Sequence, residues 1–543
     1  MRHPLTLLLT LLCLLLALPV LGVLAAWFVF DAAALAVLKH QVQTVLPDYA
    51  LQSLLLAGGV GLGVMLLGSA TAAAVTLFDF PGRRFFEWAL LLPLAMPAYV
   101  LAYAWTDALQ FSGPLQSGLR QVLGPAFGLT GALWPDVRSL PMAVMLFVLC
   151  LYPYVYLLTR TALGERAVRL MEAARLLGAP MRRRVLEVAL PMARPAIAAG
   201  TALALMETLA DYGVGSYFGL TTFSTGIYKA WLVMNDRVAA AQLAAVLLVV
   251  VAAVLMAERA AQRRLRFANS RAAAPSADAR PLVLQGTAAA AAMLLCALPV
   301  LLGFVLPVAW LMRMLWQEAQ FSEFGLPLAR FGQWALSSFK LAAIAALAAT
   351  ALALALAFAL RQRRGGPLPP AARVLSLGYA VPGAVIAIGI LLPVGWLQAR
   401  WPDAGAAALA TGTVFGLLYA YLVRFSAVAL QSVEAGYARL PMSIDETARL
   451  LGSGARRLFT ELHLPLLRRS AAAAALLVFV DVMKELPATL VLRPFGSDTL
   501  AVVAYNLARD ERLAEAALPS LAIVVVGLIP VILLSRALRA PAA

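Results

Sequence analysis

The segment Glu172-Ala173-Ala174-x3-Gly178-x9-Val188-x-Leu190-Pro191 returns in the second half of the chain as Glu446-Thr447-Ala448-x3-Gly452-x9-Leu462-x-Leu464-Pro465. All aligned positions are 274 residues apart, about half the length of the chain. Three unlike residue types, glutamate, glycine and proline, keep this spacing. The sequence therefore predicts an internal repeat.

Each copy is predicted to fold as two helices joined by a tight turn. Residues 165–177 are good helix formers. Gly178 and Gly452 stand where a helix would end in a left-handed C-cap. The complete loops cover residues 165–195 and 439–469. An ordinary surface hairpin is the competing interpretation, but it would need no second copy in register, so we favour a functional repeat.

Both segments resemble the EAA loop in the permease subunits of ABC importers. That loop reads Glu-Ala-Ala, then a glycine four residues later, then an apolar residue, any residue, Leu and Pro. The first copy has Val188 where isoleucine is usual, and the second has Thr447 and Leu462 in place of alanine and isoleucine. In that family the loop docks on the subunit that hydrolyses ATP. The resemblance implies that these residues couple the chain to an ATPase: Glu172, Ala173, Ala174, Gly178, Leu190, Pro191, Glu446, Ala448, Gly452, Leu464 and Pro465.

The composition indicates a membrane protein. Of the 543 residues, 63% are hydrophobic and 13% are charged, whereas soluble domains carry about 25% charged residues. Apolar runs recur from end to end, which predicts a polytopic α-helical protein. Cys13, Cys150 and Cys296 lie in these runs without disulfide or metal-ligand spacing. The sequence has no G-x-x-x-x-G-K-[ST] motif, so we expect no ATP site in this chain.

Twelve membrane spans are predicted from a requirement of about 20 apolar residues each. They lie near residues 5–30, 51–77, 87–107, 139–159, 195–217, 238–257, 283–315, 335–360, 374–397, 405–429, 470–492 and 516–536. The first run is too long for the core of a cleaved signal peptide, so we expect a retained helix.

Charge predicts the orientation of these spans. With the N-terminus inside, most of the 43 Lys and Arg residues fall in the inner loops and at the chain ends. The positive-inside rule then places both EAA-like loops in the cytoplasm and the long loop 108–138 outside. The net charge of +16 is explained by this topology, and we expect no nucleic-acid partner.

The repeat divides the sequence into two six-helix halves. We predict a first permease domain at 1–257, a cytoplasmic linker at 258–282 and a second permease domain at 283–543. An even number of spans returns the chain to its starting side, so the repeats are parallel. Parallel repeats of this kind place the transport route between the halves.

Intramembrane carboxylates are the candidate pathway residues. Glu207 and Asp211 in the first half align with Asp481 and Glu485 in the second. Charged groups in spans are costly and usually face the bundle interior or water. The sequence predicts both pairs on one helix face, forming an acidic route that suits a cation with oxygen ligands. The alternative is structural: pairing with a neighbour such as Lys484, or capping of broken helices.

Two prolines predict breaks in the third span of each half. They are Pro97 and Pro382, the latter followed by Gly383. Broken helices in a membrane must lie near a cavity or within packed protein, because the freed backbone groups need partners.

Several further stretches are similar to the fused permeases of ferric-iron ABC importers. They are Phe80-Pro-Gly-Arg-Arg84, Leu92-Pro-Leu-Ala-Met-Pro97, Leu209-Ala-Asp-Tyr-Gly213, Tyr217-Phe-Gly219, Thr225-Gly-Ile-Tyr-Lys-Ala-Trp231 and Met483-Lys-Glu-Leu-Pro-Ala-Thr-Leu490. The resemblance implies a type I importer fold in the bacterial inner membrane, two ATPase subunits that bind ATP and Mg²⁺, and a periplasmic ferric-binding protein. It implies no cofactor on this chain, and the sequence assigns no resident metal site.

Other functions remain open at this point. The same architecture could carry thiamine or another small solute. A secondary transporter driven by an ion gradient also uses repeats and broken helices, although the duplicated loops argue against it. No nucleophile or metal constellation supports a membrane-embedded enzyme.

Overall fold

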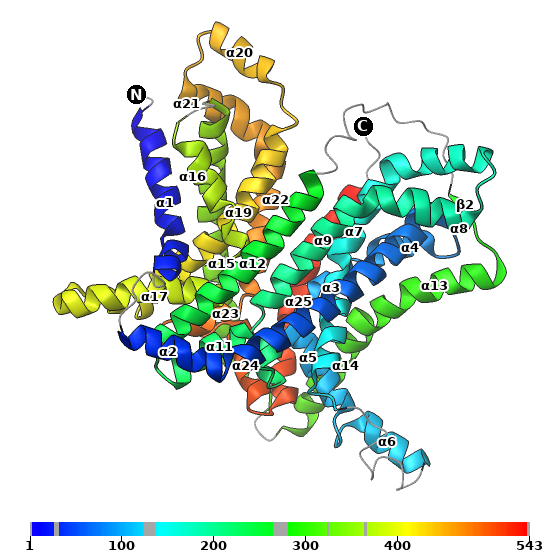
Figure 1. The fold of residues 1–543 in the computed structure, drawn as a ribbon, viewed down its shortest axis with the longest axis horizontal. Coiled ribbons are helices and arrows are strands. Elements are labelled where there is room, and N and C mark those ends of the chain that lie inside the picture. The colour runs from blue at the N-terminus through cyan, green and yellow to red at the C-terminus, as the bar shows by residue number, and fades with distance from the viewer. Residues whose placement is uncertain are drawn as a thin grey trace. The chain divides into compact units, whose positions relative to one another are not determined.

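The computed structural model describes residues 3–25, 32–123, 136–263, 281–322, 325–362 and 366–539. Most of these residues are helical, as the composition predicts. Strands β1 (Phe78–Asp79) and β2 (Leu282–Val283) form a two-residue parallel pair, in which Phe78 lies opposite Leu282. The part of the chain that the structure describes is therefore an all-α protein (Figure 1).

The helices pack into two compact units that do not coincide with the sequence halves. Unit 1 consists of Met1–Gln41, Ile227–Leu248 and Pro327–Val503. Unit 2 consists of Val42–Gly226, Val249–Leu326 and Ala504–Ala543. Each unit combines segments from both halves, and the domain boundaries 1–257 and 283–543 stay a prediction about the repeat. Of the predicted linker 258–282, residues 264–280 lie outside the described residues.

Unit 2 is built mainly from the first half of the chain. Its helices are α3 (Leu46–Leu77), α4 (Arg83–Ala89), α5 (Ala98–Leu109), α6 (Pro114–Leu123), α7 (Leu140–Leu176), α8 (Met181–Arg183), α9 (Leu190–Ala210), α10 (Gly213–Tyr217), α13 (Gly286–Val300), α14 (Leu306–Phe321) and α25 (Leu513–Arg539), with 3₁₀ or π-helical turns at Leu92–Ala95, Arg184–Ala189 and Leu301–Val305.

Unit 1 is built mainly from the second half. Its helices are α1 (His3–Ala25), α15 (Leu328–Gln362), α16 (Leu368–Leu375), α17 (Gly383–Arg400), α18 (Ala406–Thr411), α19 (Val414–Tyr437), α20 (Met442–Leu450), α21 (Ala455–Arg457), α22 (Leu464–Met483) and α23 (Pro487–Leu492), with 3₁₀ or π-helical turns at Lys229–Val233, Gly378–Ala380, Pro402–Ala404 and Leu458–His463. Four helices pass from one unit into the other along the chain: α2 (Ala32–Gln43), α11 (Phe223–Tyr228), α12 (Arg237–Arg263) and α24 (Leu500–Arg509).

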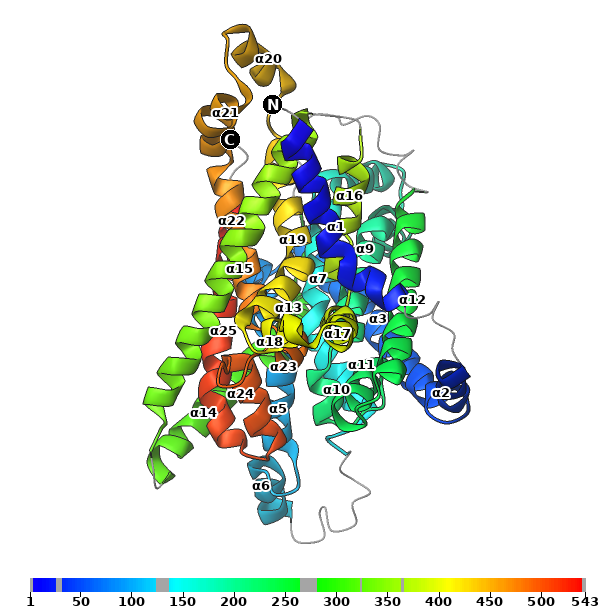
Figure 2. The same cartoon turned by 90° about the vertical axis from the view of Figure 1, so that its left-hand side faces the viewer.

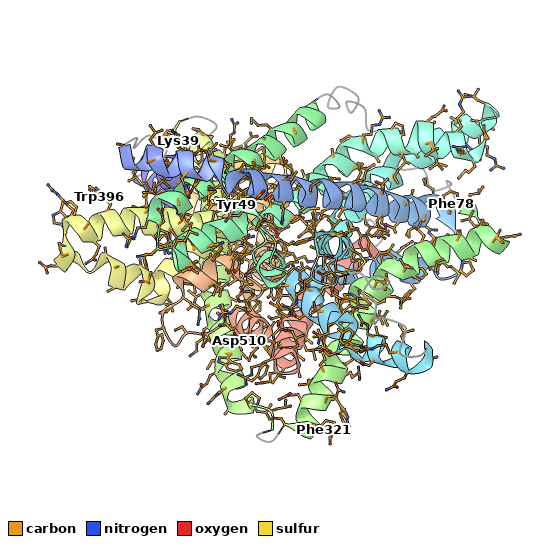
Figure 3. The ribbon with its side chains drawn as sticks, turned by 60° about the horizontal axis from the view of Figure 1, so that its bottom comes forward. Lys39, Tyr49, Phe78, Phe321, Trp396 and Asp510 are labelled. Atoms are coloured by element: carbon orange, nitrogen blue, oxygen red, sulfur yellow. The ribbon has the colours of Figure 1, made fainter. Side chains whose placement is uncertain are left out.

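Three long helices form the core of each unit. In unit 2, α3, α7 and α9 pack against one another, and in unit 1, α15, α19 and α22 do the same. Each triplet corresponds to the second, fourth and fifth predicted spans of its half, so the repeat is present in the packing as well as in the sequence. In Figure 3, the label Tyr49 marks the beginning of α3 and the label Phe78 marks the residue after its end.

Glycines let these core helices approach closely. A Cβ on Gly68 of α3 would lie 2.6 Å from the Cβ of Val155 and 2.8 Å from the carbonyl oxygen of Tyr152, both on α7. A Cβ on Gly200 of α9 would lie 2.6 Å from the Cα of Val155. Small residues at helix interfaces are a typical device of membrane bundles, where van der Waals packing replaces much of the hydrophobic effect.

The N-terminal helix is an integral part of unit 1. Helix α1 packs against α16 and α17. A Cβ on Gly389 of α17 would lie only 2.1 Å from the carbonyl oxygen of Pro19 in α1. Helix α1 thus makes a close backbone contact with the second half of the chain.

The number of continuous spans differs from the twelve predicted. Among the described residues, ten helices are long and apolar enough to cross a membrane, and the bent pair Arg83–Ala95 and Ala98–Val122 makes an eleventh. The predicted span 470–492 is not among them. It is interrupted, since α22 ends at Met483 and α23 begins at Pro487. The predicted span 195–217 likewise ends early, at Ala210.

The predicted proline breaks are confirmed. Pro97 is the N-cap of α5, and the helices on its two sides are bent by 91°. Pro382 is the N-cap of α17, which follows the short α16 and a 3₁₀ turn. In both halves the residue before the helix is a proline in the extended region, where its missing N–H is not needed.

We expect Gly68→Leu to destabilise the protein because the new side chain would collide with the backbone of α7. Overpacking of this kind costs about 1–3 kcal/mol or more. The same substitution at Gly58, on the same helix with no heavy atom within 4 Å of a Cβ, should cost little. Thermal unfolding in detergent micelles measures both. An equal melting temperature for the two variants would contradict the close approach of α3 and α7.

Candidate functional site

The first EAA-like loop turns at a left-handed glycine. Helix α7 runs through the motif and ends at Leu176. Gly178 has a φ of +78°, and its N–H donates to the carbonyl oxygen of Arg175 at 2.9 Å. The N–H of Ala179 donates to the carbonyl oxygen of Ala174 at 3.0 Å. These bonds close the end of the helix as expected for a left-handed C-cap.

The second loop repeats this turn residue by residue. Gly452 has a φ of +82°, and its N–H donates to the carbonyl oxygen of Arg449 at 2.9 Å. The N–H of Ser453 donates to the carbonyl oxygen of Ala448 at 3.0 Å. Every one of these positions is 274 residues after its counterpart. The predicted left-handed caps and the repeat are therefore confirmed in the structure.

The segment after each glycine is also duplicated. A short helix is followed by a π-helical turn at Arg184–Ala189 in one loop and at Leu458–His463 in the other. Equivalent exposed ion pairs support these turns: Arg183 with Glu187 at 2.7 Å, and Arg457 with Glu461 at 2.7 Å.

The closing Leu-Pro of each motif begins the next long helix. Leu190 and Pro191 are the first residues of α9, and Leu464 and Pro465 are the first residues of α22. A proline at this point sets the backbone angle of the first helical turn. The motif thus defines the start of the core helix that carries the candidate pathway carboxylates.

The two loops differ in how they join the preceding span. Helix α7 continues from its span into the first loop without interruption. In the second loop α19 ends at Tyr437, and α20 begins at Met442 after the N-cap Pro441. Within unit 1, α20 and α21 lie beyond the ends of α19 and α22 (Figures 1 and 2).

The motif glutamates lie at equivalent positions on these helices. Glu172 is in the last part of α7, and its side chain lies outside the described side chains. Glu446 is exposed on α20. Of the small residues beside them, Ala173 is exposed, and Ala174 and Ala448 are half-buried.

Two leucine pairs that sequence reasoning missed stand at the tips of the loops. Leu176 and Leu177 are 89% and 88% exposed, and their counterparts Leu450 and Leu451 are 89% and 81% exposed. The signal in the sequence was present: a leucine pair directly before each motif glycine. Apolar side chains this exposed, at equivalent places in both loops, make these tips candidate contact surfaces for another protein.

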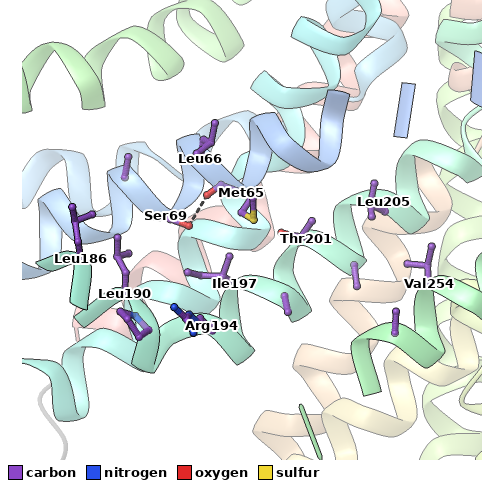
Figure 4. Close-up of a pocket in the computed structure, with 15 residues that line it drawn as sticks. Met65, Leu66, Ser69, Leu186, Leu190, Arg194, Ile197, Thr201, Leu205 and Val254 are labelled. Carbon is purple, nitrogen blue, oxygen red and sulfur yellow. Dashed lines mark hydrogen bonds between the residues drawn. The ribbon is translucent and has the colours of Figure 1, made fainter. Parts of the chain in front are cut away.

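The first loop also borders a pocket of about 690 Å³ within unit 2 (Figure 4). Its walls come from α3, α9, the π-helical turn before α9, and α12. Leu190 and Pro191 of the motif line it together with apolar residues such as Met65 and Val254. Arg194 is a charged residue in this lining. The pocket is a largely apolar space between helices.

Glu485 is held in a buried ion pair that the sequence did not predict. Its Oε1 atom lies 3.3 Å from Nη1 of Arg424 and accepts the N–H of Ala488 at 2.9 Å. Its Oε2 atom accepts the N–H of Thr489 at 3.0 Å. A Cβ on Gly383 would lie 2.8 Å from Oε1 of Glu485. Glu485 therefore caps α23 at the place where the start of α17 packs.

The other three candidate carboxylates follow the repeat: Asp211 is the counterpart of Glu485, and Glu207 is the counterpart of Asp481. The Oδ1 atom of Asp211 accepts the N–H of Val214 at 2.8 Å and caps α10. Asp481 lies 3.2 Å from Nζ of Lys484. Glu207 is half-buried in the last turn of α9.

The prediction that each carboxylate pair shares one helix face is wrong. Helix α9 ends before Asp211, and α22 ends before Glu485. The helix is interrupted between the two members of each pair because the second member turns to bind the backbone of the next helix.

Comparison with known proteins agrees with the loop geometry. Residues 64–267 match the family described as binding-protein-dependent transport system inner membrane component. The chain is 26% identical to the Fe(3+)-transport system permease protein FbpB 2 of Haemophilus influenzae over 88% of this chain and 87% of that protein.

Two further relatives match shorter parts of the chain. The chain is 34% identical to the molybdenum transport system permease protein ModB of Escherichia coli K12 over 25% of this chain and 55% of that protein. It is 28% identical to the putative 2-aminoethylphosphonate transport system permease protein PhnV of Salmonella typhimurium over 37% of this chain and 72% of that protein.

The matched region contains the whole first loop, and the second loop has the same turn. The relative that aligns along most of the chain is itself a transport permease. Permeases of this class work with an ATPase and a substrate-binding protein. Residues 64–267 thus match the membrane component of a binding-protein-dependent transport system, and the chain is similar along most of its length to a multi-pass permease of this kind.

Proposed function

We propose that this permease imports ferric iron across the bacterial inner membrane. In this proposal a periplasmic ferric-binding protein delivers the iron, and two copies of an ABC ATPase subunit drive transport. The relative that aligns with 88% of the chain is named for Fe(3+) transport. The relatives named for molybdenum and aminoethylphosphonate transport align with 25% and 37% of it. The long alignment supports iron as the substrate.

The observation that carries the coupling part of the proposal is the pair of equivalent turns. Both present an exposed leucine pair beside a left-handed glycine. Two equivalent docking elements on one chain suit two copies of one ATPase subunit. Closure of the ATPase pair would then move both loops together and, through α9 and α22, the two core bundles.

The chemistry of ATP belongs to the partner subunits in this proposal. The chain itself would bind no cofactor, and ATP and Mg²⁺ would be held by the ATPase. The permease contributes the route and the mechanical connection, and it is not itself an enzyme.

Among the candidate pathway carboxylates, we propose that Glu207 and Asp481 line the route. They are half-buried at equivalent positions near the ends of α9 and α22, where Asp481 also pairs with Lys484 at 3.2 Å. Asp211 and Glu485 already bind backbone N–H groups of the following helices, which supports a structural role for them. Oxygen ligands of carboxylates suit hard cations.

The substrate can be tested by ATP-driven uptake into proteoliposomes that contain this chain and its ATPase. We expect uptake with an iron-loaded binding protein and none with a thiamine-loaded one. Uptake of thiamine alone would support the importer mechanism but contradict iron as the substrate. Uptake of iron without ATP would overturn the importer mechanism in favour of an ion-driven transporter.

The turn glycines provide a test of coupling. We expect the double variant Gly178→Val and Gly452→Val to hydrolyse ATP with transport lowered about 30-fold or more, because a side chain in the left-handed region costs about 1–2 kcal/mol per site and the two costs add. Gly454→Val is the matched control, since Gly454 has a φ of −73° and no atom within 4 Å of a Cβ. Uptake and ATP hydrolysis are measured in the same proteoliposomes. Normal transport by the double variant would contradict the role of the turns.

The exposed leucines provide a separate test of docking. We expect Leu450→Asp with Leu451→Asp to weaken ATPase binding, because burying each leucine at the interface contributes about 1.5–3 kcal/mol. Val122→Asp, at an 83% exposed position on α6 in the predicted external loop, is the control. Co-purification of the ATPase with each variant measures the loss. Unchanged binding by the leucine variant would exclude these tips as the docking surface.

A further inference from the structure

A buried arginine fills the gap between α19 and α20 at the base of the second loop. Arg361, in the last turn of α15, donates from Nη1 to the carbonyl oxygen of Leu440 at 3.0 Å and to that of Tyr437 at 3.3 Å. Its Nη2 atom donates to the carbonyl oxygen of Pro441 at 3.0 Å. One side chain thus binds three backbone carbonyl groups at the interruption of the helix, and that of Tyr437 also accepts the N–H of Leu440 at 3.0 Å.

The same guanidinium also holds the first turn of α20. Its Nε and Nη2 atoms donate to the two carboxylate oxygens of Asp445 at 2.9 Å and 3.0 Å. The side chains of Arg361 and Asp445 are 8% and 1% exposed. A two-pronged bond of this kind fixes orientation as well as distance. Arg361 therefore connects α15 both to the segment after α19 and to α20.

A histidine extends this network to the π-helical turn before α22. Nε2 of His463 lies 3.1 Å from Oδ1 of Asp445, and Nδ1 lies 3.1 Å from the hydroxyl of Tyr437. Since a carboxylate only accepts, Nε2 carries the proton and the tyrosine hydroxyl donates to Nδ1 in the neutral ring. Four chain segments, α15, α19, α20 and the turn before α22, are joined by these four side chains.

The charges of the network balance at neutral pH. Burial disfavours the carboxylate of Asp445, but hydrogen bonds from Arg361 and His463 outweigh it and hold the pKa of Asp445 below its usual value. Burial also lowers the pKa of His463, against the raising effect of its bond to Asp445. Arg361 and Arg449 add to that lowering. The network therefore contains a charged arginine, a charged aspartate and a neutral histidine.

The first loop has an apolar cluster at the same place. The positions 274 residues before Tyr437, Asp445 and His463 are Leu163, Met171 and Ala189. All three belong to one buried hydrophobic cluster, which also contains these residues: Ala73, Leu77 and Ala193. The turn is thus the same in both loops, but the residues packed next to it are apolar in the first loop and polar or charged in the second.

The continuity of the helices explains this difference. In the first loop α7 is unbroken from span to turn, so the helix itself fixes the direction of the loop. In the second loop Pro441 separates α20 from α19, and the backbone there gives no such direction. In the second loop, the network of hydrogen bonds and ion pairs must therefore fix the direction of α20, which the unbroken helix fixes in the first loop.

We infer that Arg361 is a positioning residue that holds the second coupling helix in its working orientation, together with Asp445, and that the first loop has no need of one. This inference rests on the proposed coupling role of the second loop. The two loops would then pass the motion of the ATPase to the permease through different supports.

The orientation of α20 can be measured directly with a nitroxide label at Thr447→Cys, with the equivalent Ala173→Cys as the internal reference. Both positions are exposed, and the three native cysteines are buried. The full chain is reconstituted in nanodiscs without the ATPase. We expect Arg361→Gln to raise the mobility of the label at position 447 and to leave the label at position 173 unchanged.

Two further variants distinguish positioning from folding. Arg361→Lys keeps the charge but cannot bind three carbonyl groups and both carboxylate oxygens, so it should also raise mobility at position 447. Asp445→Asn keeps the shape of the buried side chain and should have a smaller effect, because the carbonyl bonds of Arg361 remain. Arg160→Gln is the control, since Arg160 pairs with Glu87 at 3.1 Å and binds no part of either loop.

The same variants in proteoliposomes with the ATPase separate this inference from the proposed function. We expect Arg361→Lys to raise the ATP hydrolysed per ion transported about fivefold or more, the lower range of coupling between sites. Unchanged mobility at position 447 in both arginine variants would overturn the positioning role. Raised mobility with an unchanged ratio would instead overturn the proposed coupling role of the loop.

Discussion

Inside a membrane, backbone groups freed by a helix break have no water to bind, so each break must find partners within the protein. In this structure, carboxylates that the sequence suggests for a transport route bind the freed backbone groups. Glu485 binds two N–H groups at the start of α23, and Asp211 binds one at the start of α10. Arg424 balances Glu485, and the broken third span of the second half packs on this pair at Gly383. The broken helices and the buried charges thus depend on each other.

This dependence bears on how the permease could move. A break whose polar groups are bound by a side chain can change direction without exposing them to lipid. The breaks after α9 and α22 follow directly on the long helices that begin at the Leu-Pro of each loop. A displacement of a loop would therefore reach the interrupted region along one rigid helix, which is a physical path for coupling.

Much of the fold could be predicted because its signals are local. Pro97 and Pro382 each predict a helix break, and Gly178 and Gly452 each predict a turn. The 274-residue spacing predicts the repeat. The ends of α9 and α22 entered the sequence analysis only as an alternative, the capping of broken helices, because apolar runs continue past Asp211 and Glu485 and hide the interruption. By the positive-inside rule, Arg361 and Arg424 count only as positive charges near the cytoplasmic side. Their roles depend on which segments meet in space, and a single sequence does not contain that information.

The assignment of helices to units has a consequence for biosynthesis. Unit 1 needs Met1–Gln41 together with Pro327–Val503, and α1 makes its close contact with α17. At a synthesis rate of about 5–20 residues per second, α1 must wait roughly 20–75 s before α17 has been made. During that time its face toward Gly389 is open to lipid or to other membrane proteins. Helix α1 is thus packed only after much of the second half of the chain has been made.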